Sequence, residues 1–151
     1  MDHEQTFLMR SSFFIFAPGI LANSVFKDHW GRPRPRQVDM FGGSMPFHQP
    51  WQPGPAPKNA SFPAGHPTIA FYLSAPYFVL RGKKSRSQAL LWLWGGIFYG
   101  VIMGMARIIQ GGHFVTDVIW SAGFVYLTAI LLTALMKLDT APGMTLSRKR
   151  L

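Results

Sequence analysis

Apolar residues gather in four long stretches of the chain, separated by basic or proline-rich segments. The stretches are Phe7 to Phe26, Thr68 to Leu80, Ala89 to Ala106 and Phe114 to Met136. Since a helix needs roughly 20 residues to cross a bilayer, the last two are long enough alone and the second is short. The first is adequate in length but contains Arg10 and Pro18. The pattern predicts a single all-α membrane domain over residues 1–151, a bundle with about four spanning helices.

Short basic segments orient these predicted helices. Residues 81–86 and 147–150 are rich in arginine and lysine, which is typical of cytoplasmic loops and of a basic cytoplasmic tail over 137–151. Threading the helices from that assignment places residues 27–66 and 107–113 together on the non-cytoplasmic side. Residues 27–66 are equally basic, an exception that anion binding explains. The N-terminus lacks the basic start of a secretory signal, so no removable signal peptide is expected.

The segment 27–66 differs from the rest of the chain in its backbone chemistry. It contains eight prolines, and it also holds Gly42, Gly43 and Gly54. Because proline removes a backbone donor and clashes inside a helix, this density predicts a long irregular loop of the kind that carries function.

Composition supports a membrane protein over a soluble one. Hydrophobic residues make up 48% of the chain and charged residues 14%, whereas charged residues form about a quarter of a typical soluble domain. The formal charge of +9 is divided among short clusters between apolar stretches, which favours a membrane over nucleic acid as partner. The absence of cysteine excludes disulfides, thiolate metal sites and a cysteine nucleophile.

His113 and Asp117 are the first candidate chemical pair. They are four residues apart, so a helix that begins just after Gly112 would place both side chains on one face, where the carboxylate orients the imidazole. A carboxylate inside an apolar span is costly without a partner. The pattern indicates a nucleophile or base at His113, with Asp117 as its orienting group.

Three cations lie in the segments that the topology brings to the same side: Lys27, Arg34 and Arg107. Guanidinium groups bind phosphoryl oxygens with two hydrogen bonds each, and phosphoryl transfer depends mainly on such positioning and charge stabilisation. Taken alone, each cation is better explained as the end of a membrane helix, an interfacial anchor or a contact to anionic lipid headgroups.

Residues Ala64, Gly65 and His66 directly precede the second apolar stretch. Backbone N–H groups at the start of a helix favour an anion, and Gly65 permits its close approach. His66 is suited to protonate a departing oxygen as general acid.

A metal site is the other interpretation of His66, His113 and Asp117. Two histidines and a carboxylate could bind a divalent ion, but the surrounding cations favour an anion. We therefore expect no metal and no cofactor.

The three segments resemble the signature of the type 2 phosphatidic acid phosphatase (PAP2) superfamily: Lys-x6-Arg-Pro, Pro-Ser-Gly-His and Ser-Arg-x5-His-x3-Asp. The matching blocks are Lys27 with Arg34-Pro35, Pro63-Ala64-Gly65-His66, and Ala106-Arg107 with His113 and Asp117. The sequence of residues 26–35, together with Phe41-Gly42-Gly43, looks like that of the bacterial lipid A phosphatase group within that superfamily.

The resemblance implies a metal-independent phosphatase of the bacterial inner membrane, with its site on the periplasmic side. It implies a phosphohistidine on His113, general-acid chemistry at His66 and an orienting role for Asp117. The implied phosphate ligands are Lys27, Arg34, Arg107, the Gly65 N–H and position 64.

Two features depart from the family pattern. Alanine stands at 64 and 106 in place of serine, and losing the hydroxyl at 64 costs roughly 1.5–3 kcal/mol of phosphate binding, which predicts lower activity. Membrane members of the family usually have six spans, so the count is consistent with a chain that lacks two N-terminal helices, as a natural short form or a fragment.

The implied substrate is a lipid A-type saccharide phosphate. Undecaprenyl pyrophosphate, phosphatidate and phosphatidylglycerophosphate are the alternatives within the same chemistry. The alternative to an enzyme is a non-catalytic phosphate-binding membrane subunit, because Ala64 and Ala106 replace residues that carry hydroxyls. A vanadate haloperoxidase shares the signature, but such proteins are usually large and soluble, so the apolar stretches argue against it.

Overall fold

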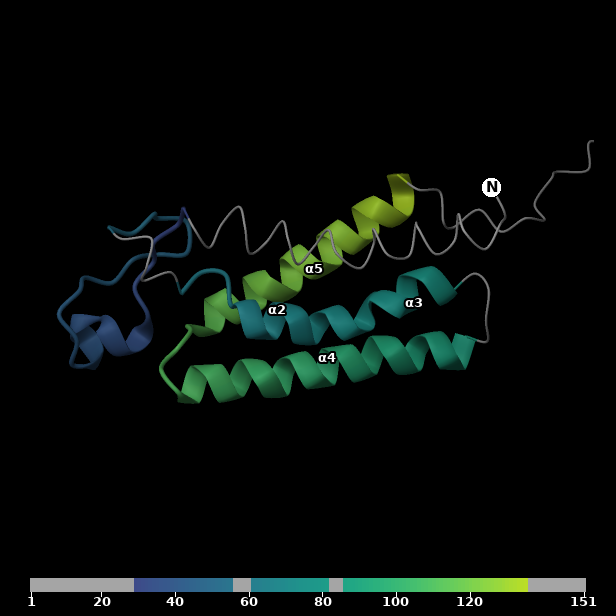
Figure 1. The fold of residues 1–151 in the computed structure, drawn as a ribbon, viewed down its shortest axis with the longest axis horizontal. Helices are drawn as coiled ribbons and strands as arrows, with labels where there is room; N and C mark the ends of the chain where they lie inside the picture. The colour runs from purple at the N-terminus through teal and green to yellow at the C-terminus, as the bar shows by residue number, and fades with distance from the viewer. Residues whose placement is uncertain (1–28, 56–60, 82–85, 136–151) are drawn as a thin grey trace, which may run out of the picture.

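The computed structural model describes residues 29–55, 61–81 and 86–135, and the regular structure within these ranges is helical (Figure 1). The expectation of an all-α protein is confirmed there. The first predicted stretch, Phe7 to Phe26, lies outside the described residues, as do Lys27 and the basic tail.

Two long helices, α4 (Arg86–Ile109) and α5 (Val115–Leu135), are apolar and long enough to cross a membrane. Their bounds lie within a few residues of the third and fourth predicted stretches. Large apolar side chains such as Trp94, Phe98 and Leu127 point outward from them and are exposed. Such a surface suits lipid, where a helix satisfies its backbone internally.

The second predicted stretch is not one helix. It forms α2 (Gly65–Phe71), the 3₁₀ turn η5 (Tyr72–Ser74) and α3 (Ala75–Leu80) in succession. Pro76 lies in the first turn of α3, where its missing N–H is tolerated, although it could not continue the ladder of α2. Helical structure therefore begins three residues before Thr68 and is interrupted midway.

Glycines along one side of α4 allow these short helices to pack closely against it. Gly96, Gly100 and Gly104 are buried at four-residue spacing. A Cβ atom at Gly100 would overlap the Phe71 ring of α2, and one at Gly96 would overlap the backbone of Ser74. Small residues at this spacing let helices approach in membranes, so the contact depends on glycine at these positions.

The proline-rich loop lies at one end of the bundle. It contains two 3₁₀ turns, η2 (Pro35–Gln37) and η3 (Asp39–Phe41), and an isolated bridge joins Val38, between the turns, to Met45 after them. The Arg36 N–H donates to the Gly111 carbonyl at 3.2 Å, which docks the loop on the turn between α4 and α5.

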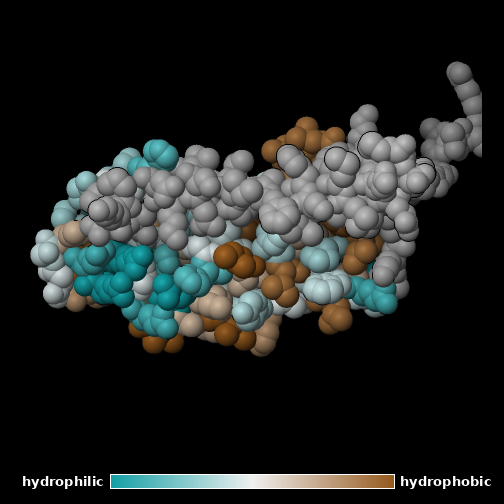
Figure 2. All heavy atoms as spheres, viewed as in Figure 1, coloured by the Kyte–Doolittle hydropathy of each residue, from teal (hydrophilic) through white to brown (hydrophobic). Residues whose placement is uncertain are grey.

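The two ends of the described bundle are therefore different. The loop, the start of α2 and the α4–α5 turn share one end, whereas α3 ends and α4 begins at the other (Figure 1). Figure 2 shows hydrophilic residues gathered around the loop end, with hydrophobic residues prominent over the helices. This polarity suits a polar head at the membrane surface above a lipid-embedded body.

Candidate active site

The structure brings the described motif residues to the loop end of the bundle. Arg34 directly precedes η2, Gly65 begins α2, and Arg107 lies in the last turn of α4. His113 lies in the α4–α5 turn, and Asp117 lies in the first turn of α5. Segments separated by many residues in the sequence thus meet at one place.

His113 is held by a backbone carbonyl. Its side chain is 4% exposed, and Nδ1 lies 2.6 Å from the carbonyl oxygen of Ser61. Because a carbonyl oxygen only accepts, this hydrogen bond requires the proton on Nδ1. The neutral ring then carries its lone pair on Nε2, the atom that would attack an electrophile.

The surroundings of His113 keep it neutral. Burial lowers its pKa from the ordinary 6.5 to about 4. The Ser61 carbonyl and Asp117 act in the opposite direction, whereas the nearby charges of Arg107 and Arg34 lower the pKa further. The imidazole is therefore unprotonated, and available as a nucleophile, over the whole physiological range.

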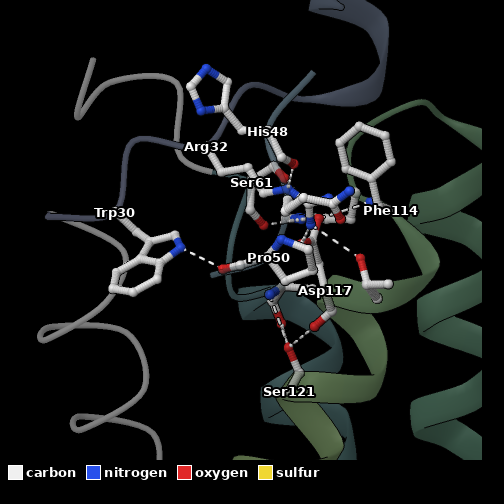
Figure 3. A network of polar contacts seen from close by, with 12 residues as sticks. Trp30, Arg32, His48, Pro50, Ser61, Phe114, Asp117 and Ser121 are labelled. Atoms are coloured by element: carbon white, nitrogen blue, oxygen red, sulfur yellow. Dashed lines mark hydrogen bonds and ion pairs between the residues drawn. The ribbon is translucent and has the colours of Figure 1, made fainter. Parts of the chain in front are cut away.

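Asp117 is completely buried and surrounded by donors (Figure 3). Its Oδ2 accepts hydrogen bonds from the Ser61 hydroxyl at 2.7 Å and from the Phe114 N–H at 2.8 Å. Its Oδ1 accepts from the guanidinium of Arg32. Three donors thus compensate the charge of a carboxylate that would otherwise be costly at this depth.

The expected hydrogen bond between Asp117 and His113 is not formed in the structure. Asp117 Oδ2 lies 4.0 Å from His113 Nδ1, within reach of an ion pair when the ring is charged, and the Ser61 carbonyl takes the ring proton. The reason is that α5 begins at Val115, so His113 precedes the helix and helical i,i+4 geometry does not apply to the pair. The orienting role of Asp117 stays a prediction.

Sequence reasoning did not single out Arg32 as a site residue. Arg32 is 1% exposed. Besides Asp117, its guanidinium donates to the His48 carbonyl at 2.9 Å and to the Thr116 hydroxyl at 3.1 Å, and it lies 4.3 Å from the centre of the Phe114 ring. The available signal was Asp117, because a carboxylate within an apolar span needs a partner such as a cation. Arg32 was a candidate for that partner, since it lies two residues before Arg34.

Arg34 and Arg107 form the cationic part of the site. Burial lowers the pKa of Arg34, and so do the charges of Arg36 and Arg107, which places these cations within electrostatic reach of one another. Arg107 Nη1 donates to Gln110 Oε1 at 2.7 Å, while its buried Nε has no hydrogen-bond partner in the part of the chain that the structure describes. A group of cations with an unused buried donor favours an anion.

The three residues of the segment 64–66 differ in their burial and hydrogen bonding. Ala64 is completely buried, its methyl group packs with Phe71 and Val118, and its N–H donates to the Ser121 hydroxyl at 2.9 Å. Gly65 is buried, whereas His66 is exposed. The amide of Ala64 is thus already used within the protein, and the phosphate-binding and acid roles predicted for this segment stay predictions.

An open pocket of about 510 Å³ adjoins His113. Its apolar lining includes Phe41, Ile109 and Val115, and Arg36 and Gln110 add polar groups. A molecule with both apolar and anionic parts fits such a lining.

In residues 29–55, 61–81 and 86–135, no group of three or more histidines or carboxylates is arranged to hold a metal ion. His113 and Asp117 do lie close together, but Asp117 is bonded to Arg32 and Ser61.

Comparisons with known proteins agree with this chemistry. A family model described as the PAP2 superfamily matches residues 8–140. The chain is 38% identical over 120 residues to a lipid A 4'-phosphatase of Francisella tularensis subsp. novicida, a match that covers 79% of the chain and 53% of that protein. It is 32% identical to lipid A 4'-phosphatases of Rhizobium leguminosarum and Rhizobium etli, over 78% of the chain and 50% and 45% of those proteins. The chain spans about half the length of the curated relatives it matches. No solved structure matches it.

Proposed function

The chain belongs to the PAP2 superfamily, and from that membership and the geometry at His113 we propose that it is a membrane phosphatase acting on a lipid-linked phosphate through a phosphohistidine. The observation that carries this proposal is the hydrogen bond from His113 Nδ1 to the Ser61 carbonyl. That bond leaves the Nε2 lone pair free beside the cations Arg34 and Arg107.

In the first step, the lone pair of His113 Nε2 forms a bond to phosphorus while the bond from phosphorus to the lipid oxygen breaks. His66 donates a proton to that oxygen, which departs as an alcohol. The phosphorylated ring keeps its proton on Nδ1 and is cationic. The Ser61 carbonyl and the Asp117 carboxylate, 4.0 Å away, stabilise that charge.

In the second step, a water oxygen attacks phosphorus and passes a proton to His66. The bond between phosphorus and nitrogen breaks, its electron pair returns to Nε2, and inorganic phosphate leaves. Arg34, Arg107, Lys27 and the Gly65 N–H are the proposed ligands of the phosphoryl oxygens. The buried Nε of Arg107, unpaired among the described residues, supports this assignment for Arg107.

The proposed substrate class is a lipid A-type saccharide phosphate. Two observations support it: the relatives named lipid A 4'-phosphatase, and the pocket beside His113 that combines Phe41 and Ile109 with Arg36. Undecaprenyl pyrophosphate, phosphatidate and phosphatidylglycerophosphate offer similar chemistry and are the comparison substrates. The proposed location is the bacterial inner membrane, with the site on the periplasmic side.

The test is phosphate release by the full chain purified in detergent. We expect lipid A to lose phosphate in the presence of a chelator, and vanadate to inhibit the reaction. The panel of comparison lipids then ranks the substrates by kcat/KM. No release from any of them would contradict the proposed activity.

Binding without turnover is the second candidate, because alanine at 64 lies with its methyl group in an apolar cluster and offers no hydroxyl to phosphate. Vanadate bound by the chain, with no phosphate released from the lipid panel, would identify a phosphate-binding membrane subunit.

A further inference from the structure

Ser61 connects the two residues at the centre of the site. Its hydroxyl donates to Asp117 Oδ2 at 2.7 Å, and its carbonyl accepts the Nδ1 proton of His113 at 2.6 Å. Its N–H donates to the backbone carbonyl of Arg32 at 2.7 Å. Ser61 is completely buried, so these bonds form without competition from solvent. Ser61 therefore links Asp117 to His113 through two hydrogen bonds.

Arg32 holds the other side of Asp117. Its Nη1 donates to Asp117 Oδ1 and to the Thr116 hydroxyl, and its Nε donates to the His48 carbonyl (Figure 3). Lysine could not reproduce this set, because an ammonium group lacks the planar fork of a guanidinium. The arrangement fixes the carboxylate in both position and direction.

The charges around His113 give this arrangement a chemical consequence. The charged groups that act on the ring are Asp117, which favours its protonated form, and Arg107 and Arg34, which oppose that form. Arg32 and the Ser61 hydroxyl both bind the Asp117 carboxylate, which disperses its charge and occupies its lone pairs. These bonds weaken the pull of the neighbouring carboxylate on a proton of the ring.

We propose that Arg32 and Ser61 are positioning residues: Arg32 fixes Asp117, Asp117 fixes Ser61, and the Ser61 carbonyl holds His113 with Nε2 free. The consequence for catalysis rests on the proposed function above, whereas the consequence for the ring itself does not. A merely structural role for Arg32 would stabilise the loop through His48 without changing the state of His113.

The experiment compares four variants of the full chain in detergent: Ser61→Ala, Arg32→Lys, Arg32→Gln and the control Ser74→Ala. Ser74 is also a completely buried serine, and its hydroxyl donates to the Phe71 carbonyl at 2.6 Å, away from His113. Nitrogen-15 NMR of the histidine rings reports the protonated nitrogen and the pKa of His113. Steady-state kinetics with lipid A separates kcat from KM.

We expect the wild type to show His113 as the Nδ1–H form. In Ser61→Ala and Arg32→Gln, the pKa of His113 should rise by about one unit or more, because the Asp117 charge is less compensated. In Ser61→Ala and Arg32→Lys, kcat should fall roughly 10- to 100-fold with KM within about twofold of wild type, as expected for loss of a hydrogen bond to a charged group. Ser74→Ala should change neither kcat nor the pKa of His113.

An Nε2–H ring in the wild type would overturn the proposal, and so would Ser61→Ala with unchanged kcat and an unchanged His113 pKa. Should Arg32→Gln fail to fold, Ser61→Ala and Arg32→Lys still decide the question. If the wild type releases no phosphate, the proposed function fails, but the NMR comparison still tests the positioning of His113.

Discussion

His113 Nδ1 donates a hydrogen bond to the backbone carbonyl of Ser61, 2.6 Å away and 52 residues distant in the sequence. This contact determines which ring nitrogen carries the proton, and hence which nitrogen is free to react. A carbonyl has no charge to gain or lose, so the contact persists across a wide pH range.

The protonation of His113 offers a direct test of its surroundings. Burial disfavours the charged ring and lowers its pKa to about 4, so the neutral, reactive form predominates above about pH 5. An NMR titration should show one histidine resonance, absent in His113→Gln, with a midpoint near 4. Bound vanadate should raise that midpoint, because an anion offsets the charges of Arg34 and Arg107. A midpoint near 6.5 in the free protein would contradict this account.

Replacing the buried carboxylate should destabilise the fold. In Asp117→Asn the guanidinium of Arg32 remains buried without its counter-charge, which costs about 3–5 kcal/mol of unfolding free energy. Chemical unfolding in detergent measures this loss. The matched control is Asp39→Asn at an exposed position, where the change should stay within about 0.5 kcal/mol. Equal stabilities for the two variants would be inconsistent with a critical pair between Arg32 and Asp117.

Arg107 should bind the phosphoryl group through its fork of donors. Arg107→Lys keeps the charge but loses the Nε donor that is buried without a partner in the described part of the chain. The vanadate Kd should rise about 10-fold, the effect of one hydrogen bond to a charged group. Arg86→Lys, at the opposite end of the same helix, serves as control and should leave the Kd unchanged. An unchanged Kd in Arg107→Lys would remove this arginine from the site.

Two glycines of α4, Gly95 and Gly100, should respond oppositely to alanine. A Cβ atom at Gly100 would overlap the Phe71 ring, so Gly100→Ala should lower the unfolding free energy by about 1–3 kcal/mol. Among the residues that the structure describes, none outside the helix places an atom within 4 Å of a Cβ at Gly95, and Gly95→Ala should raise the unfolding free energy by about 0.5–1 kcal/mol through helix propensity. Thermal unfolding of both variants in one detergent compares them. Destabilisation by both substitutions would argue against the close packing of α2 on α4.

Hydropathy and spacing predicted a large part of this protein. The apolar stretches anticipated α4 and α5 because long uninterrupted apolar segments leave few alternatives to a helix. The signature residues also anticipated the family, which the match over residues 8–140 confirms. The break between α2 and α3 was missed, although Pro76 was a visible reason for it.

The hydrogen bonds of the site were less accessible to sequence reasoning. A spacing of four suggested that Asp117 contacts His113, but the helix begins too late for that geometry, and the partner is a backbone carbonyl that no side-chain pattern reveals. The substitution at 64 was noticed as a missing hydroxyl, whereas only the structure shows its methyl group within an apolar cluster.

The central claim is that Nε2 of His113 becomes phosphorylated. The most direct measurement is rapid acid-free quenching of the full chain with lipid A labelled in its phosphate, followed by mass spectrometry of the peptide that contains residue 113. The account predicts a phosphorylated His113 in the wild type, and neither adduct nor phosphate release in His113→Gln. Phosphate release that persists in His113→Gln would contradict it.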